Sequence, residues 1–402
     1  MLSYRKLAMC VLGRPLHTGG GIDSPRPASQ RAAAFILTAA MLTTLAAPAF
    51  AGTWYIEDGN ITISAGTEAG TNKVEQAGKD TVDNDKDTII TNQNKDKASS
   101  NTVTIDAGND KVEVTLDNVN IKTDSGSALT SKGDVTLALN GDNHLTGGIS
   151  GTGNYGRNGI ASTGSLTISG GENDSLTAQG GSGADGSYGG HGIYSNGSLT
   201  ISGGTVNATG GDGSNVNGSG ISSNGSVTIS GGTVTANGGN GGNVSGDGIR
   251  SDGGVTISGG TVKAAGGDGS DGGSGISSSS GVTVSDGTVT ANGGNGGNVS
   301  GDGIRSDGGV TISGGTVKAA GGDSKDGYGG DGIRSGGGVT ISGNTVNAAG
   351  GNGGKVGGYG ICSFDRVAIS GGTVNAAGGS SGSSNGGSGI YSNDIDLSGS
   401  LE

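Results

Sequence analysis

Carboxylates inside glycine-rich segments are the first candidates for chemistry in this sequence. The segments GGSGAD at residues 180–185 and GGDGSD at residues 266–271 match half of the calcium-binding nonapeptide G-G-x-G-x-D-x-U-x. Carboxylates on stacked turns are hard oxygen ligands that can share a calcium ion, and Asp185, Asp268 and Asp271 are the candidate ligands. The pattern occurs once per repeat and drifts to GGNGGN and GGDGSN, so the alternative is a solvated acidic loop without metal.

The residue after the isoleucine of each Gly-Ile pair is the second candidate. It is arginine or tyrosine in five repeats: Tyr194, Arg250, Arg305, Arg334 and Tyr391. A line of guanidinium groups can bind carboxylates or sugar hydroxyls along an extended polymer, and tyrosine offers an apolar ring with a polar end. The alternative is an exposed ion pair of little energetic weight between each arginine and the aspartate three residues before it, Asp247, Asp302 or Asp331.

A third position, five residues before the same isoleucines, holds tyrosine in some repeats and valine in others. Tyr155, Tyr188 and Tyr328 could form a stacking surface for sugar rings. Because valine occupies the same position elsewhere, we expect this position to be half-buried and its tyrosines mainly to pack against their neighbours.

Catalytic arrangements do not stand out. His144 and His191 lie in different parts of the chain, no G-x-S-x-G occurs, and no pair of carboxylates is distinguished from the loops. We therefore expect a protein that is not an enzyme. A polysaccharide lyase is the less favoured alternative, because it would need a cluster of residues confined to one or two repeats.

The candidate residues recur because the chain itself is a repeat. The sequence GDGIRSDGGVTISGGTVKAAGGD at residues 246–268 recurs unchanged at 301–323, and degenerate copies extend from about residue 159 to the end. The isoleucines of the Gly-Ile pairs follow one another at intervals of 27 to 29 residues after a first interval of 33. Such constancy is typical of a solenoid that turns once per repeat.

Each repeat contains three short runs that predict strands, for example GIRS, VTIS and TVKA. Strand alternation turns five side chains of that coil inward: Ile249, Val255, Ile257, Val262 and Ala264. The sequence therefore predicts an all-β fold, a right-handed single-stranded parallel β-helix (solenoid) with about 28 residues and three short strands per coil. Because glycine is costly to order, we expect the remaining glycine-rich loop either to be loose or to be ordered by a bound ligand.

Three regions are predicted along the chain. They are a signal peptide with a long N-terminal extension at residues 1–51, N-terminal irregular or capping coils of the β-helix at 52–150, and a glycine-rich repeat β-helix at 151–402. Basic residues before the apolar run AAAFILTAAMLTTLAA, and the small residues of PAFA before Gly52, are typical of an export signal. We expect a secreted or cell-surface protein that does not insert into the membrane once the signal is cleaved.

Charge and cysteine content narrow the possible partners. Removal of residues 1–51 leaves 17 basic and 34 acidic residues, a net charge of −17, and a single cysteine, Cys362. This charge disfavours nucleic acid and anionic membrane surfaces as partners, and one cysteine allows no intramolecular disulfide. Neutral polysaccharide, cationic partners and divalent metal remain compatible.

The repeat and its lead-in sequences NTVTIDAG, KVEVTLDNVNI and KGDVTLALNGDNHLTGG resemble the parallel β-helix carbohydrate-binding domain of surface proteins from clostridia and related gut bacteria. That domain is similar in fold to pectate lyases without the lytic residues, and the resemblance extends from about residue 53 to the end. It implies noncatalytic binding of plant or uronic-acid polysaccharides, with calcium in some members, and assigns no individual binding residue. The resulting hypothesis is carbohydrate binding on an elongated side face. The alternative is a repetitive adhesin or structural stalk without a glycan ligand, associated end to end or with the cell surface.

Overall fold

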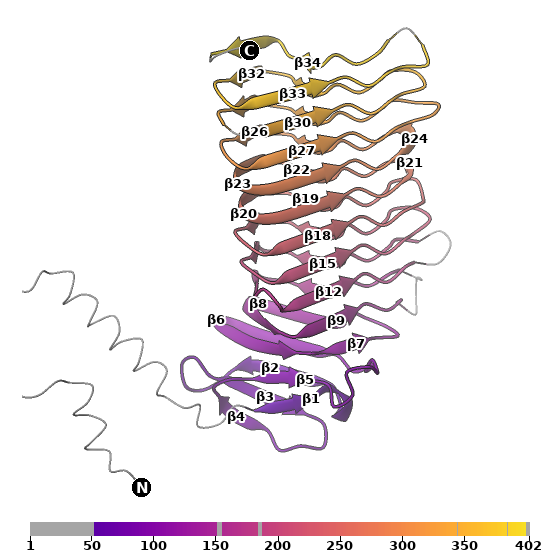
Figure 1. The fold of residues 1–402 in the computed structure, drawn as a ribbon. Helices are drawn as coiled ribbons and strands as arrows, with labels where there is room; N and C mark the ends of the chain where they lie inside the picture. Colours follow the sequence, from indigo (N-terminus) through magenta and orange to yellow (C-terminus); the bar gives the residue numbers. More distant parts are fainter. Residues whose placement is uncertain (1–51, 151–154, 184–186, 344, 384, 399–402) are drawn as a thin grey trace, which may run out of the picture. The chain divides into compact units, whose positions relative to one another are not determined.

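The computed structural model describes residues 52–150, 155–183, 187–343, 345–383 and 385–398, which wind into a right-handed parallel β-helix (Figure 1). The single helical element among them is a 3₁₀ turn, η1 (Ile56–Asp58). The expected all-β solenoid with almost no helix is therefore confirmed. The predicted signal at 1–51 lies outside the described residues, and within them no helix is long and apolar enough to cross a membrane.

The strand that begins at each Gly-Ile pair forms the first of three strand columns. Its members pair in parallel and in register, so that isoleucine lies over isoleucine from one coil to the next. The strands are β10 (Ile160–Ser162), β13 (Ile193–Ser195), β16 (Ile221–Ser223), β19 (Ile249–Ser251), β22 (Ile276–Ser278), β25 (Ile304–Ser306), β28 (Ile333–Ser335), β31 (Ile361–Ser363) and β34 (Ile390–Tyr391).

The second and third columns are formed by the V-T-I and T-V-x-A runs of the repeat. Strands of the second column are β11 (Leu166–Gly170), β14 (Leu199–Ile201), β17 (Val227–Ile229), β26 (Gly309–Ile312), β29 (Val339–Ile341), β32 (Arg366–Ile369) and β35 (Asp394–Leu397). Strands of the third column are β12 (Ser175–Gln179), β15 (Thr205–Thr209), β18 (Thr233–Asn237), β27 (Thr316–Ala320), β30 (Thr345–Ala349) and β33 (Thr373–Ala377). Two longer strands, β20 (Gly254–Ala265) and β23 (Gly281–Asn292), run through both columns.

The corner between the second and third columns is the S-G-G segment. Its second glycine takes a left-handed backbone conformation, with φ of +75° at Gly232 and +77° at Gly260. A side chain is disfavoured in that conformation, so glycine is required for the chain to turn there.

Residues before the repeats form strands of more varied length and direction. They are β1 (Thr53–Tyr55), β2 (Ile61–Ala65), β3 (Asn72–Gln76), β4 (Val82–Asp85), β5 (Ile89–Thr91), β6 (Val103–Asp117), β7 (Asn120–Lys122), β8 (Leu129–Asn140) and β9 (Asp142–Thr146). Strands β2, β3 and β4 pair antiparallel, whereas β6 and β8 pair in parallel and lead into the first repeat. Trp54 is buried and its Nε1–H donates to Asp85 Oδ2 at 3.1 Å, which ties the first strand to β4.

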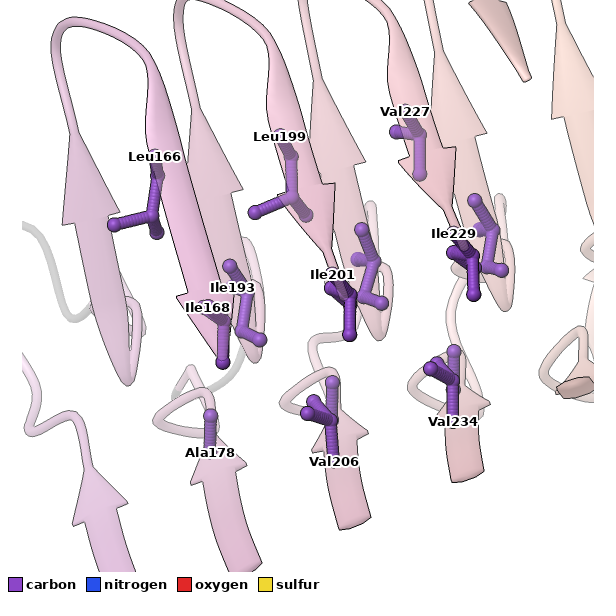
Figure 2. Close-up of a cluster of buried hydrophobic side chains, with 14 of the residues drawn as sticks. Leu166, Ile168, Ala178, Ile193, Leu199, Ile201, Val206, Val227, Ile229 and Val234 are labelled. Carbon is purple, nitrogen blue, oxygen red and sulfur yellow. The ribbon is translucent and has the colours of Figure 1, made fainter. Parts of the chain in front are cut away.

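The core is a stack of identical or similar side chains, one layer per coil (Figure 2). Leu166, Leu199 and Val227 lie in register in the second column, and all three are at most 1% exposed. The five inward positions predicted for residues 249–264 are likewise buried. Because no coil can cover its own apolar face, the neighbouring coils supply the packing.

A buried serine two residues after the isoleucine, in the coils from Ile160 to Ile361, was not foreseen. Ser251 Oγ donates to Gly225 O at 2.8 Å, and Ser278 Oγ donates to Gly253 O at 2.8 Å. Both hydroxyls therefore bond to the preceding coil, which satisfies polar groups that would be costly to bury alone.

In the described residues the glycine-rich loop is held by its own backbone hydrogen bonds, so the expectation of a loose loop is wrong there. Gly267 N–H donates to Gly246 O at 2.9 Å, and Gly273 N–H donates to Gly267 O at 2.9 Å. The same two bonds repeat in the following coils, for example from Gly294 to Gly273 at 2.8 Å. A Cβ on Gly273 would lie 1.9 Å from Gly246 O, so backbones approach too closely for any other residue.

Candidate functional site

A groove of about 930 Å³ runs along one side of seven successive coils, from the coil of Ile193 to the coil of Ile361. Three columns of side chains line it, each at a fixed offset from the isoleucines. The floor column is His191, Ser219, Asp247, Ser274, Asp302, Asp331 and Tyr359; the arginine column is Tyr194, Ser222, Arg250, Ser277, Arg305 and Arg334; the rim column is Val216, Val244, Asp271, Val299, Tyr328 and Val356.

In-register pairing of the first strand column aligns the groove. Arg250 pairs with Ser277, Ser277 pairs with Arg305, and Arg305 pairs with Arg334. Rim residues are joined by single parallel bridges, such as Val299 to Tyr328. Seven coils separated by about 4.8 Å make a groove of about 29 Å, which suits an extended chain rather than a compact ligand.

The structure brings the three predicted arginines to one wall of the groove. Their side chains are 57%, 53% and 42% exposed for Arg250, Arg305 and Arg334. Tyr194 lies at the first coil of the same wall, where its ring stacks on that of His191 with centroids 5.7 Å apart. Tyr391 does not line the groove, but it stacks on Tyr359 of the floor with centroids 4.8 Å apart.

The expected ion pair with the aspartate three residues earlier forms only at Arg334, whose Nη1 lies 3.6 Å from Asp331 Oδ2. At Arg250 and Arg305 the expectation is wrong. Their Nε atoms instead face the aspartates two residues later, at 3.9 Å from Asp252 and 4.0 Å from Asp307. All three separations exceed a hydrogen-bond length, so the guanidinium donors remain available to a ligand.

Asp302 and Asp331 of the floor are buried, Asp247 is partly buried, and the side chains of all three join one coil to the next. Asp302 and Asp331 are 7% and 5% exposed. Asp302 Oδ1 accepts the Asp331 N–H at 2.7 Å, Asp331 Oδ1 accepts the Tyr359 N–H at 2.7 Å, and Asp247 Oδ1 accepts the Ser274 N–H at 2.7 Å. His191 does the same through Nδ1, which accepts the Ser219 N–H at 2.8 Å.

Burial sets the protonation of the floor. It raises the pKa of Asp302 to about 7, an effect that the neighbouring Asp331 carboxylate reinforces and that Arg334 and Arg305 oppose. The pKa values of Asp247 and Asp331 are also raised, mainly by burial. The pKa of His191 moves the other way, to about 4, because burial and the Arg250 charge disfavour its cationic form.

The rim is more exposed than the presence of valine indicated. Val244, Val299 and Tyr328 are 47%, 48% and 48% exposed. The expected packing of tyrosines is present between Tyr155 and Tyr188, whose ring centroids are 5.3 Å apart, yet each remains 44% exposed. The rim therefore offers apolar surface along the groove.

The calcium candidates fall in separate places. Asp268 lies on the glycine-rich loop, where its Oδ1 accepts the Asn295 N–H at 2.6 Å, whereas Asp271 belongs to the rim column. Asp185 lies outside the described residues. Among the residues that the structure describes, no three or more His, Cys, Asp or Glu side chains are grouped so that they could hold a metal ion.

Sequence reasoning missed the floor column. The sequence feature that could have revealed this column is the residue between the two glycines that precede the isoleucine. In three coils this residue is an aspartate: Asp247, Asp302 and Asp331. Because alternation predicts direction only within strands, this position just before the strand was taken as exposed.

Comparison with known proteins supports the fold. The family model described as Beta helix repeat matches residues 199–225, 227–249, 255–280 and 310–333. No curated protein and no solved structure gives a significant match to this chain. The matched segments identify these coils, which carry most of the groove, as β-helix repeats.

Proposed function

We propose that this protein binds an extended polysaccharide in the groove without chemically altering it. The observation that carries the proposal is the continuous groove of seven coils, with exposed guanidinium groups on one wall and exposed apolar side chains on the rim. Guanidinium forks bind hydroxyl and carboxylate oxygens, and aromatic rings offer faces to sugars. The coil spacing is close to the length of one pyranose unit in an extended chain.

The charge of the groove favours a chain that is neutral or carries few carboxylates. Three arginines line it together with six carboxylates: Asp247, Asp252, Asp271, Asp302, Asp307 and Asp331. Serine and asparagine side chains lie between them, as at Ser277 and Asn224. Such alternation of donors and acceptors suits the hydroxyl groups of a plant polysaccharide, whereas uronic-acid chains meet excess negative charge when every carboxyl is ionised.

The test is binding of the chain from residue 52 to insoluble cellulose and to pectin gels. Arg305→Ala should weaken retention about tenfold, since a charged hydrogen bond contributes about 1.5 kcal/mol or more. Lys318→Ala is the matched control, because Lys318 is exposed on the same coil but does not line the groove. No retention of the unmodified chain on cellulose, pectin or host glycans would overturn the proposal, and release of unsaturated uronides from pectate would replace it with a lyase.

Secretion is part of the same proposal and depends on the predicted signal at residues 1–51. N-terminal sequencing of protein from the culture medium and the cell surface tests it. A start at Gly52 is the expected result, and protein found only inside cells with residues 1–51 still attached contradicts it.

A competing proposal is a stalk without a glycan ligand, whose repeats only set its length. The observation in its favour is the glycine-rich loop, in which every coil repeats the same backbone bonds. If carbohydrate retention fails while coil deletions change the reach of the protein from the cell surface, the stalk is the better account.

A further inference from the structure

The three floor carboxyls, Asp247, Asp302 and Asp331, lie where a bound chain would contact the groove, and their protonation decides the charge that such a chain meets. Asp302 and Asp331 occupy adjacent coils, whose strands β25 and β28 pair in register, so their backbones are about 4.8 Å apart. Both side chains are buried, and each already uses one oxygen to accept a backbone N–H. Asp302 therefore has a second oxygen whose charge is poorly solvated.

The groups facing these carboxyls do not neutralise them fully. Asp302 faces the Asp331 carboxyl and the Arg305 and Arg334 guanidiniums, and neither arginine lies within 4.0 Å of it. Asp331 faces Arg334, at 3.6 Å, and accepts a hydrogen bond from the Cys362 thiol.

Asp247, two coils away from Asp302, faces Arg250 and Arg305. Both of these guanidiniums lie nearer to exposed aspartates of the groove than to Asp247. Ionised floor carboxyls thus leave the groove with more negative than positive charge.

We propose that Asp247, Asp302 and Asp331 act as a proton-controlled filter that lets the groove accept uronic-acid chains only when the floor is protonated. The inference rests on the polysaccharide binding proposed above and concerns its selectivity. With the floor protonated, the three exposed carboxylates Asp252, Asp271 and Asp307 balance the three arginines. With the floor ionised, the groove has an excess of three negative charges and repels a carboxylated chain, whereas a neutral chain is unaffected. A protonated floor carboxyl also donates an O–H to a ligand oxygen.

The pH range follows from the groups that line the groove. The pKa of Asp302, near 7, and the raised pKa values of Asp247 and Asp331 put the change in floor charge above the ordinary range of carboxyls. His191 does not contribute between pH 5.5 and 8, since its pKa is lowered to about 4. Cys362 stays neutral, since burial raises the pKa of its thiol to about 12. Uronic-acid carboxyls remain ionised throughout this range.

The experiment measures affinity for oligogalacturonate and for a neutral cello-oligosaccharide of equal length, at pH 5.5 and pH 8 and constant ionic strength. The probe protein is the chain from residue 52, which lies within a single compact unit. Affinity for oligogalacturonate should fall roughly tenfold or more from pH 5.5 to pH 8, while affinity for the neutral chain stays constant.

Asp302→Asn separates the floor from other titrating groups. Asparagine keeps an oxygen that can accept the Asp331 N–H but carries no charge, so the variant should lose part of the pH dependence, while Asp247 and Asp331 still titrate. Asp307→Asn is the matched control: it removes an exposed carboxylate of the same coil, and should raise affinity for oligogalacturonate at both pH values while leaving their ratio unchanged.

Each outcome decides a different question. Equal affinity for oligogalacturonate at the two pH values overturns the filter and leaves polysaccharide binding intact. An equal loss of affinity for both oligosaccharides at pH 8 also overturns the filter, because ionisation of the floor would then disturb the fold rather than select ligands by charge. Failure to bind either oligosaccharide at either pH overturns the proposed function together with the filter.

Discussion

Replacing Asp302 with asparagine should stabilise the β-helix above neutral pH. Burial raises the pKa of Asp302 from 3.8 to about 7, so in the folded chain this carboxyl holds its proton over a range in which the unfolded chain has lost it. The contribution of Asp302 to the free energy of unfolding must therefore fall as the pH rises from about 4 to about 7. About three pKa units correspond to about 4 kcal/mol, the upper bound on the cost of ionised Asp302 at pH 8.

Asparagine removes that cost and keeps the acceptor for the Asp331 N–H at 2.7 Å. Its amide introduces N–H donors that need partners, so we expect a net gain of about 2 to 3 kcal/mol at pH 8. Well below pH 3.8, where aspartic acid is neutral in both states, the variant should equal the unmodified chain or be slightly less stable.

The assay is urea unfolding followed by circular dichroism at pH 4, 6 and 8. A solenoid can unfold in segments, so hydrogen exchange of the Asp331 and Tyr359 amides gives a local readout beside the global one. Asp307→Asn is the control; its carboxyl is 65% exposed, so its effect should stay within about 0.5 kcal/mol at every pH. The reasoning fails if Asp302→Asn lowers stability at pH 8, or if the stability difference between the variant and the unmodified chain is the same at pH 8 as at pH 4.

Three further predictions concern the loops and inward serines that hold the coils of the β-helix together. Gly273→Ala should lower the free energy of unfolding by about 3 kcal/mol or more, because its Cβ would lie 1.9 Å from Gly246 O. The control is Gly254→Ala, whose Cβ would lie 3.5 Å from its nearest neighbour; in the same urea assay it should lower the free energy of unfolding by less than about 1 kcal/mol. Ser278→Ala should lower the free energy of unfolding by about 1 to 3 kcal/mol, because the hydroxyl bonds to carbonyl groups of its own coil and of the preceding coil. An unchanged free energy of unfolding would show that water replaces the hydroxyl. Chelation should leave the thermal midpoint unchanged, because the Asp268 carboxylate already accepts a backbone N–H of the next coil; a lower midpoint in chelator would support structural calcium.

The three strand columns could be predicted because the sequence patterns that indicate them are local and repeated. Alternation placed Ile249, Val255 and Ile257 inside, and each is at most 1% exposed. The interval of 27 to 29 residues required like residues to stack, and the register confirms it, as in Ile249 over Ile276. Both results depend on period and polarity alone, which a sequence displays directly.

The glycine loop could not be predicted in the same way, since glycine has no side chain to reveal a direction. Composition showed only that ordering such a segment is costly. What offsets the cost is contact between backbones of adjacent coils, such as Gly273 N–H to Gly267 O at 2.9 Å. That contact depends on chains far apart in sequence, and only the assembled coils display it.

The floor of the groove shows why the candidate site was predicted only in part. Arg250, Arg305 and Arg334 were recognised because charged side chains on a strand alternate outward, and the structure leaves them exposed. Asp302 was assigned to the surface because it was expected to form an exposed ion pair with Arg305, three residues later. In this fold the column position matters more than the residue type, because the same place holds histidine, serine, aspartate and tyrosine in successive coils.

The invariant positions of the repeat therefore determine the fold, whereas the variable positions determine the chemistry of the groove. Glycine, isoleucine and inward serine fix the path of each coil, and they bring the variable positions to one groove in register. Because the floor position holds histidine, serine, aspartate or tyrosine while the first strand column keeps its register, a change there should alter charge and hydrogen bonding without moving the walls. An exchange such as Asp302 for the serine found at the same place in the coil of Ser274 should thus change which polysaccharide binds before it changes whether the protein folds.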